Sequence, residues 1–145
     1  MSYLAGIDLG STTLKAVIYD LHGNVVASAC RPTVQIHPDD RRPEWSVWMP
    51  DQIWGDSAAA MQEAVAQLDD PHRIKGVAVT GMGMDGVPVD ENGQWLYPFI
   101  SLHCPRTQPQ FDWWSEHITA ERTFATGGNT LWRFSGSFFT GCTPY

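Results

Sequence analysis

The 145-residue sequence contains no hydrophobic run of the roughly 20 residues that a membrane-spanning helix needs, so we expect no membrane partner. Basic residues are scarce: nine Lys and Arg stand against sixteen Asp and Glu, and the formal net charge of −7 argues against nucleic acid as a partner. The three cysteines form no CxxC pair, and no charged leader precedes an apolar run. We therefore expect reduced thiols, no secretory leader and a cytoplasmic location.

Apolar residues make up 43% of the chain and charged residues 17%, a balance typical of a globular domain, and the length fits one domain. Short β-branched runs bounded by turn signals alternate with segments of helical spacing. The expected strands span residues 3–8, 14–20, 25–30 and 74–83, the first three as an antiparallel meander and the last buried. The expected helices span residues 50–68, 108–117 and 120–125, with a hairpin turn at 91–93. The pattern predicts a mixed α/β fold.

The turn between the first two expected strands, within "GIDLGSTTLKAVIYD", carries more hydroxyl groups than a turn needs. Backbone N–H groups and short hydroxyls at a hairpin tip form a nest that suits phosphate oxygens. Asp8 ends the first strand beside this tip, where a carboxylate can hold Mg²⁺, and Lys15 can reach a phosphate as a point charge. An ordinary β-hairpin with a polar tip remains the alternative, because Gly and Ser fill many turns.

The same segment, followed by "GNVVA", resembles the first phosphate motif of the actin-like and sugar-kinase ATPases. Two further segments, "PEWSVWMPDQIWGDSAAAMQEAV" and "IKGVAVTGMGMDGVPVDENGQWLYPFISLHCPRT", are similar to segments of the FGGY carbohydrate kinases. The Gly83-Met84-Asp85 turn, "CPRT" and "NTLW" resemble the L-fuculokinase and rhamnulokinase branch. The resemblance covers residues 3–134 and implies a ribonuclease-H-like, actin-like ATPase fold, with a mixed sheet flanked by helices.

On the nucleotide side, the resemblance implies ATP and Mg²⁺ as cofactors. Asp8 would lie near the Mg²⁺ of MgATP. The residues bordering the β- and γ-phosphates would be Ser11, Thr12, Thr13 and Lys15.

On the sugar side, the resemblance places Gly83 and Asp85 in the pocket lining, Arg106 at the pocket edge and Trp45 as an apolar wall. Each position has an alternative. Gly83 would serve a turn with positive φ and Asp85 a turn cap. Arg106 would form a surface ion pair, and Trp45 would be a core aromatic residue.

The implied activity is transfer of the ATP γ-phosphate to a hydroxyl of a small sugar, a ketose such as L-fuculose or L-rhamnulose. The family's catalytic aspartate and second domain are expected downstream of this chain, so we expect the chain alone to be inactive. The alternative is a truncated half-domain with weak nucleotide or sugar binding only. ATPase activators of radical dehydratases have a similar first motif, but the cysteine spacing here does not fit their iron–sulfur cluster.

We expect residues 1–134 to form a partial, incomplete N-terminal kinase domain and residues 135–145 to be a divergent tail. An incomplete domain leaves apolar side chains uncovered, which favours self-association. The candidates for exposure are Trp113, Trp114, Phe138 and Phe139.

Overall fold

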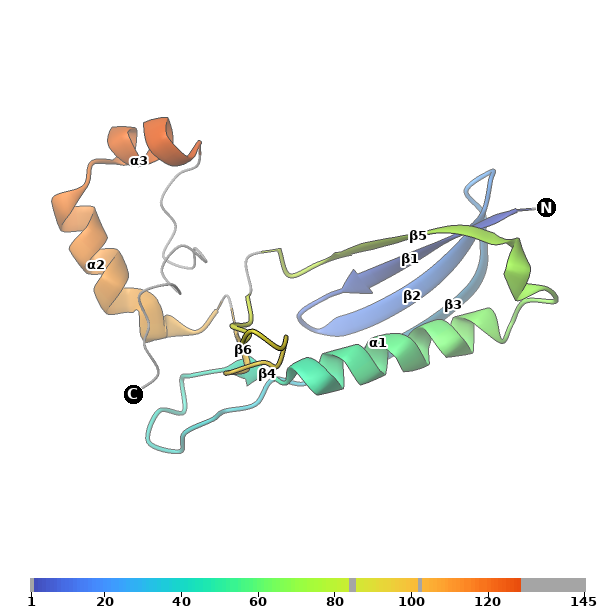
Figure 1. Ribbon diagram of the computed structural model, residues 1–145, viewed down its shortest axis with the longest axis horizontal. Coiled ribbons are helices and arrows are strands. Elements are labelled where there is room, and N and C mark those ends of the chain that lie inside the picture. Colours follow the sequence, from blue (N-terminus) through green and yellow to red (C-terminus); the bar gives the residue numbers. More distant parts are fainter. Residues whose placement is uncertain (1, 84–85, 102, 129–145) are drawn as a thin grey trace. The chain divides into compact units, whose positions relative to one another are not determined.

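A computed structural model describes residues 2–83, 86–101 and 103–128 of the chain (Figure 1). The chain divides into two compact units, Met1–Gln35 with Trp48–Gly83, and Ile36–Val47 with Met84–Tyr145, and each is described by itself. Within the described ranges, no helix has the length and apolar character that crossing a membrane requires. The predicted tail at 135–145 lies outside these ranges, and the division into a 1–134 domain and a tail stays a prediction.

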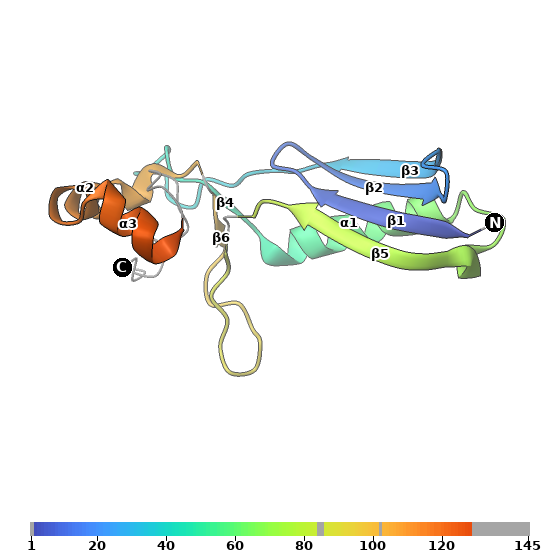
Figure 2. The same ribbon diagram turned by 90° about the horizontal axis from the view of Figure 1, so that it is seen from above.

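The first unit contains a four-stranded mixed sheet in the order β3-β2-β1-β5 (Figure 2). β1 (Tyr3–Leu9), β2 (Thr13–Asp20) and β3 (Val25–Pro32) form the predicted antiparallel meander. β5 (Ile74–Gly81) lies parallel to β1. The three-stranded antiparallel opening and the mixed sheet are therefore confirmed.

One face of this sheet packs against α1 (Pro50–Val65), as Figures 1 and 2 show. Proline at the first helical position and Asp51 in the first turn favour a helix start there. Small side chains form the contact: Ala60 and Ala64 of α1 and Ala16 of β2 are each fully buried. They pack in one cluster with Ala5, Leu14, Ile18, Ala27 and Ala29. Because these side chains are short, helix and sheet approach closely.

Trp54 shows that helical spacing alone does not identify the packed face of α1. The helix over 50–68 was predicted from four apolar residues at near-helical spacing, Trp54, Met61, Val65 and Leu68. Trp54 is nevertheless 77% exposed. Met61 and Val65, from the same pattern, do pack against the buried cluster. The helix and its start at Pro50 were predicted correctly, although it ends at Val65 rather than at residue 68, and the position of its buried stripe is set by the small residues Ala60 and Ala64.

The expectation that β5 is buried is wrong. Val77 and Val79 are 62% and 63% exposed. The cause is the placement of α1, which packs mainly on β2 and β3. The strand register pairs Val77 with Ala5 and Val79 with Ile7, so these valines lie on the α1 side of the sheet but beyond the helix.

The turn between β2 and β3 is organised by the carboxylate of Asp20. It accepts hydrogen bonds from the backbone N–H groups of His22 at 2.8 Å and Asn24 at 2.9 Å, and from Asn24 Nδ2 at 2.8 Å. The Asn24 side chain, then its backbone N–H, lowers the pKa of Asp20 below its usual value. Gly23 supplies the left-handed conformation of the turn with a φ of 86°.

After α1, the 3-10 helix η1 (Pro71–Arg73) leads into β5, and the carboxylate of Asp70 caps it by accepting from the backbone N–H of His72.

The second unit contains short elements. β4 (Val47–Trp48), which spans the point where the chain passes from this unit to the first, and β6 (Phe99–Ile100) form a two-stranded sheet. The predicted hairpin turn is confirmed, since Asp90 and Gln94 are joined by a backbone hydrogen bond of 2.8 Å. The 3-10 helix η2 (Pro105–Thr107) precedes α2 (Gln108–His117) and α3 (Ala120–Gly127), which match the two predicted short helices.

The aromatic residues of α2 only partly follow the expected exposure. Trp113 is 55% exposed and stacks on His117, with the ring centroids 4.5 Å apart. Trp114 is half-buried instead, and its Nε1 donates a hydrogen bond of 3.1 Å to Thr123 Oγ1 of α3. Phe138 and Phe139 lie outside the described residues.

Candidate functional site

The tip between β1 and β2 is a tight turn that requires glycine at its start. A Cβ atom on Gly10 would lie 2.5 Å from the carbonyl oxygen of Thr13, closer than real Cβ contacts. Two other carbonyl oxygens of the tip bind Thr33, which follows β3. Thr33 Oγ1 donates to the oxygen of Gly10 at 2.7 Å, and the Thr33 N–H donates to the oxygen of Thr12 at 3.0 Å. Two carbonyl oxygens that would repel a bound anion therefore already accept hydrogen bonds.

Thr33 is a site residue that sequence reasoning missed. It lies twenty-three positions from Gly10 in a polar segment without periodicity. Only the pairing of β2 with β3, which sets Thr13 opposite Pro32, carries Thr33 to the tip. No local signal in the sequence reports a contact of this kind.

Three polar residues lie in one row across the sheet beside the tip: the predicted Asp8 and Lys15, and their neighbour Thr80. The register sets Asp8 of β1 opposite Lys15 of β2 on one side and Thr80 of β5 on the other. All three side chains are exposed. They lie on the face away from α1, because side chains alternate along a strand and the neighbouring residue of β2, Leu14, is buried against the helix. Ser11 and Thr12 are also exposed, and Thr13 is half-buried.

The ends of β1 and β5 lie side by side because the two strands are parallel. Leu9 is the register partner of Gly81, and a Cβ on Gly81 would lie 2.5 Å from the Cβ of Leu9. The hydroxyl-rich tip and the segment that contains Gly83 therefore leave the same end of the sheet. Gly83 is exposed and does not adopt a positive φ, so the alternative of a left-handed turn at this residue is wrong. Asp85 lies outside the described residues.

A small cavity lies near Thr33, at the start of α1. It measures about 10 Å³, room for about one water molecule, and is therefore too small for a sugar or a nucleotide. Its lining residues are Leu14, Pro32, Thr33, Val34, Met49, Gln52, Ile53 and Asp56.

In the second unit, the structure brings together the two remaining candidates, Trp45 and Arg106. The guanidinium carbon of Arg106 lies 4.4 Å from the ring centroid of Trp45, within the range of a cation–π contact. Both residues are half-buried. Arg42 approaches the same ring at 5.8 Å. Trp48, three positions further along the chain, is buried with 1% of its surface exposed.

Two residues that sequence reasoning did not select fix the Arg106 side chain. Its Nη1 donates a hydrogen bond of 2.9 Å to Tyr97 Oη, and its Nε donates one of 3.0 Å to Cys104 Sγ. Burial by itself lowers the pKa of Arg106, but the hydrogen bonds to Cys104 and Tyr97 outweigh it and the pKa lies above its usual value. Nη2 is buried and makes no hydrogen bond to any of the described residues. These two hydrogen-bond partners are a thiol sulfur and a phenol oxygen rather than carboxylates.

The described cysteines are free thiols, Cys30 exposed and Cys104 buried. Among the described residues, no three His, Cys, Asp or Glu side chains cluster as metal ligands. Asp8 therefore offers a single carboxylate.

The fold of the chain matches solved sugar and glycerol kinases. Glycerol kinase of Plasmodium falciparum, solved with ADP, aligns with a TM-score of 0.80 over 96% of this chain and 28% of that chain, at 19% identity. Xylulose kinase of Rhodospirillum rubrum aligns with a TM-score of 0.76 over 85% of this chain and 25% of that chain, at 29% identity. The predicted actin-like ATPase fold is confirmed.

The chain belongs to the FGGY family of carbohydrate kinases, whose N-terminal domain model matches residues 3–139. L-fuculokinase of Escherichia coli strain K12 is 34% identical over 133 residues, which are 88% of this chain and 28% of that enzyme. The resemblance to the L-fuculokinase branch is thereby confirmed. The chain spans little more than a quarter of the length of this relative.

Proposed function

We propose that this chain supplies the phosphate-binding tip and one wall of the sugar pocket of an ATP-dependent sugar kinase. The reaction would transfer the γ-phosphate of ATP to a hydroxyl of a ketose such as L-fuculose or L-rhamnulose. One observation carries the proposal: the pairing of β1 with β2 on one side and with β5 on the other brings Asp8, Lys15 and Thr80 into one row beside the hydroxyl-rich tip. Phosphoryl transfer depends on positioning and charge neutralisation, and this row provides a carboxylate and an ammonium group for both.

The tip suits the β- and γ-phosphates because its exposed hydroxyl groups can donate hydrogen bonds to phosphate oxygens. Thr33 occupies the carbonyl oxygens of Gly10 and Thr12, while the hydroxyls of Ser11 and Thr12 are exposed. Short hydroxyls and backbone N–H groups bind phosphate oxygens well. Lys15 adds a positive charge two positions beyond Thr13, which completes the predicted set.

A single carboxylate at Asp8 fits Mg²⁺ that arrives bound to ATP. Mg²⁺ keeps several water ligands and is usually held by one or two carboxylates together with substrate phosphates. The exposed Asp8 at the end of β1 can serve as that carboxylate, directly or through water. Bound Mg²⁺ would neutralise charge that develops on the phosphates.

The sugar-side roles rest on Trp45 and Arg106. A half-buried indole offers an apolar face to a sugar ring, and the guanidinium beside it is held by Tyr97 and Cys104. Its buried Nη2 has no partner within the part of the chain that the structure describes, and the oxygen of a sugar hydroxyl is an acceptor that would satisfy it. Gly83 and Asp85 stay proposed sugar-pocket residues on the strength of the family resemblance alone.

A binding-only half-domain is the second candidate, and the coverage of the relatives favours it for the chain by itself. The chain spans 28% of the E. coli L-fuculokinase. Kinases of this kind need a base and closure over both substrates to exclude water. We therefore expect the 145-residue chain to bind MgATP weakly and not to phosphorylate sugars.

The test is a calorimetric titration of the full chain with MgATP, followed by a kinase assay with L-fuculose, L-rhamnulose, xylulose and glycerol. We expect Lys15→Gln to weaken MgATP binding about fivefold or more, since a charged hydrogen bond is lost. Lys75→Gln is the matched control, because Lys75 is exposed at the far end of β5, where its Nζ donates to the backbone oxygen of His72. Equal affinities of the two variants would overturn the nucleotide site. Sugar phosphorylation by the chain alone would overturn its expected inactivity.

A further inference from the structure

The residue that follows β3 fastens the hydroxyl-rich tip through two hydrogen bonds. Thr33 donates from Oγ1 to the carbonyl oxygen of Gly10 at 2.7 Å, and from its backbone N–H to the carbonyl oxygen of Thr12 at 3.0 Å. Both bonds end on backbone oxygens of the tip, so they fix the orientation of two of its peptide groups. Thr33 thus constrains the conformation of the tip from a segment that is distant in the sequence.

The direction of each carbonyl group also sets the direction of the N–H group in the same peptide unit. A trans peptide is planar, and its C=O and N–H bonds point in opposite directions. No cis peptide bond occurs among the described residues. Because the oxygens of Gly10 and Thr12 point toward Thr33, the N–H groups of Ser11 and Thr13 point away from it. The side of the tip opposite Thr33 therefore receives two backbone donors and neither of these two acceptors.

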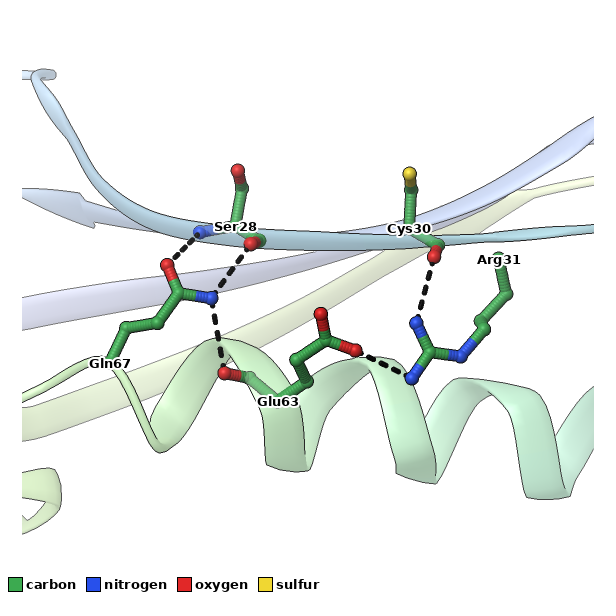
Figure 3. Close-up of polar contacts among 5 residues, drawn as sticks. All are labelled: Ser28, Cys30, Arg31, Glu63 and Gln67. Carbon is green, nitrogen blue, oxygen red and sulfur yellow. Dashed lines mark hydrogen bonds and ion pairs between the residues drawn. The ribbon is translucent and has the colours of Figure 1, made fainter.

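The strand that brings Thr33 to the tip is itself held on α1 (Figure 3). The side-chain amide of Gln67, just beyond the end of α1, bonds both backbone groups of Ser28. Its Nε2 donates to the Ser28 oxygen at 2.9 Å, and the Ser28 N–H donates to its Oε1 at 3.4 Å. Arg31, two positions before Thr33, forms an ion pair with Glu63 of α1. The end of β3 is thus a fixed support for Thr33.

The residue types at this position reduce the entropy that the two bonds cost. Pro32 directly precedes Thr33, and its ring fixes φ near −65°. Threonine is branched at Cβ, so few χ1 rotamers compete with the one that reaches Gly10. Backbone and side chain therefore have little freedom to lose when Thr33 binds the tip.

We propose that Thr33 is a positioning residue for phosphate binding, which holds the tip in the conformation that presents the Ser11 and Thr13 N–H groups to a phosphate group. The inference rests on the proposed nucleotide site and adds a residue that acts on it without touching the ligand. A ligand that binds one conformation of a loop loses apparent affinity in proportion to the fraction of molecules in that conformation. Loss of the Thr33 hydroxyl should therefore weaken phosphate binding.

The test titrates the full chain with magnesium tripolyphosphate, which has the phosphate chain of ATP without the nucleoside, and measures affinity by calorimetry. Thr33→Ser keeps the hydroxyl and should bind like the parent. Thr33→Ala loses the bond to Gly10 but keeps the backbone bond to Thr12, and its affinity should fall about threefold to tenfold.

Thr33→Val should bind more weakly than Thr33→Ala. It places a methyl carbon close to the position of Oγ1, which lies 2.7 Å from the oxygen of Gly10. Carbon–oxygen contacts normally begin at about 3.3 Å, so the Gly10 carbonyl would have to move by about 0.5 Å or more.

Ser57→Ala is the matched control, because it removes a bond of the same kind from another part of the first unit. Ser57 Oγ donates to the carbonyl oxygen of Ile53 within α1 at 2.6 Å. We expect this variant to bind tripolyphosphate like the parent. Far-UV circular dichroism and urea denaturation check that every variant folds. In the parent, the backbone amide signals of Ser11 and Thr13 in NMR spectra should shift when tripolyphosphate is added.

The outcomes separate this inference from the proposed function. If Lys15→Gln weakens tripolyphosphate binding while folded Thr33→Ala binds like the parent, the nucleotide site stands and the role of Thr33 is refuted. Equal weakening by Thr33→Ser and Thr33→Ala, or by Ser57→Ala, would also refute it, as would unshifted Ser11 and Thr13 amides in a chain that binds. If the parent does not bind, the nucleotide site and this inference are both wrong.

Discussion

Replacing Gly81 by alanine tests the close approach of β1 and β5, on which the candidate nucleotide site depends. An added Cβ would lie 2.5 Å from the Cβ of Leu9 and 2.9 Å from its carbonyl oxygen. Carbon atoms in contact normally lie about 3.5 to 4.0 Å apart, so the ends of the two strands would have to separate by about 1 Å. Leu9 contributes backbone and Cβ here, which no change of rotamer can move.

Overpacking of this kind costs about 1–3 kcal/mol, and a ladder hydrogen bond lost at the strand ends adds about 1 kcal/mol. Urea denaturation measures the effect. With a denaturant slope of about 2 kcal/mol per M, a loss of about 2 kcal/mol lowers the midpoint by about 1 M.

Gly55→Ala is the matched control for Gly81→Ala. Gly55 lies inside α1, and a Cβ there would meet nothing within 4 Å. Alanine is favoured over glycine in a helix by about 0.8–1.0 kcal/mol, so this variant should unfold at a higher urea concentration than the parent. The same chemical change is thus expected to act in opposite directions at the two positions. A Gly81→Ala midpoint at or above that of the parent would refute the inferred proximity of the strand ends.

Two other substitutions test the core and the β2–β3 turn. Ile18 is fully buried, so Ile18→Ala should lower the free energy of unfolding by about 2–5 kcal/mol. Val17 lies on the opposite face of the sheet, and Val17→Ala should lower it by less. Equal losses of the two variants in urea titrations would contradict the assigned faces. The Asn24 side chain holds the pKa of Asp20 below its usual value. The ionised carboxylate therefore stabilises the fold fully above the pKa of Asp in the unfolded chain, about 3.9. This stabilisation is lost as the pH falls through the lower pKa of the folded state. Asp20→Asn should therefore lose less thermal stability on acidification than the parent, and parallel curves would disprove that link.

The elements with strong local signals were predictable from the sequence. The meander follows from three β-branched runs around the Gly10 and Gly23 turns, and α1 follows from its Pro50 start and apolar spacing. Helix α2 was predicted with both ends, residues 108 and 117, correct. These features depend on neighbours in the chain, which a single sequence reports well.

Contacts between distant segments were not predictable in the same way. The exposure of Val77 depends on which strands α1 covers, and no pattern within β5 contains that information. The hydrogen bond from Thr33 to Gly10 depends on the register of β3. Arg106 and Trp45 were selected by family resemblance, but Tyr97 and Cys104, which hold the guanidinium, were not selected by any motif.

The pairing of Asp8 with Thr80 has a consequence for synthesis of the chain. The two residues are neighbours in the sheet and 72 positions apart in the sequence (80 − 8 = 72). The tip and its Thr33 bonds are complete once β3 has left the ribosome, whereas β5 must wait for 48 more residues (81 − 33 = 48). At about 5–20 residues per second, the nascent hairpin therefore spends about 2–10 seconds with β2 on one side of Asp8 and no strand on the other.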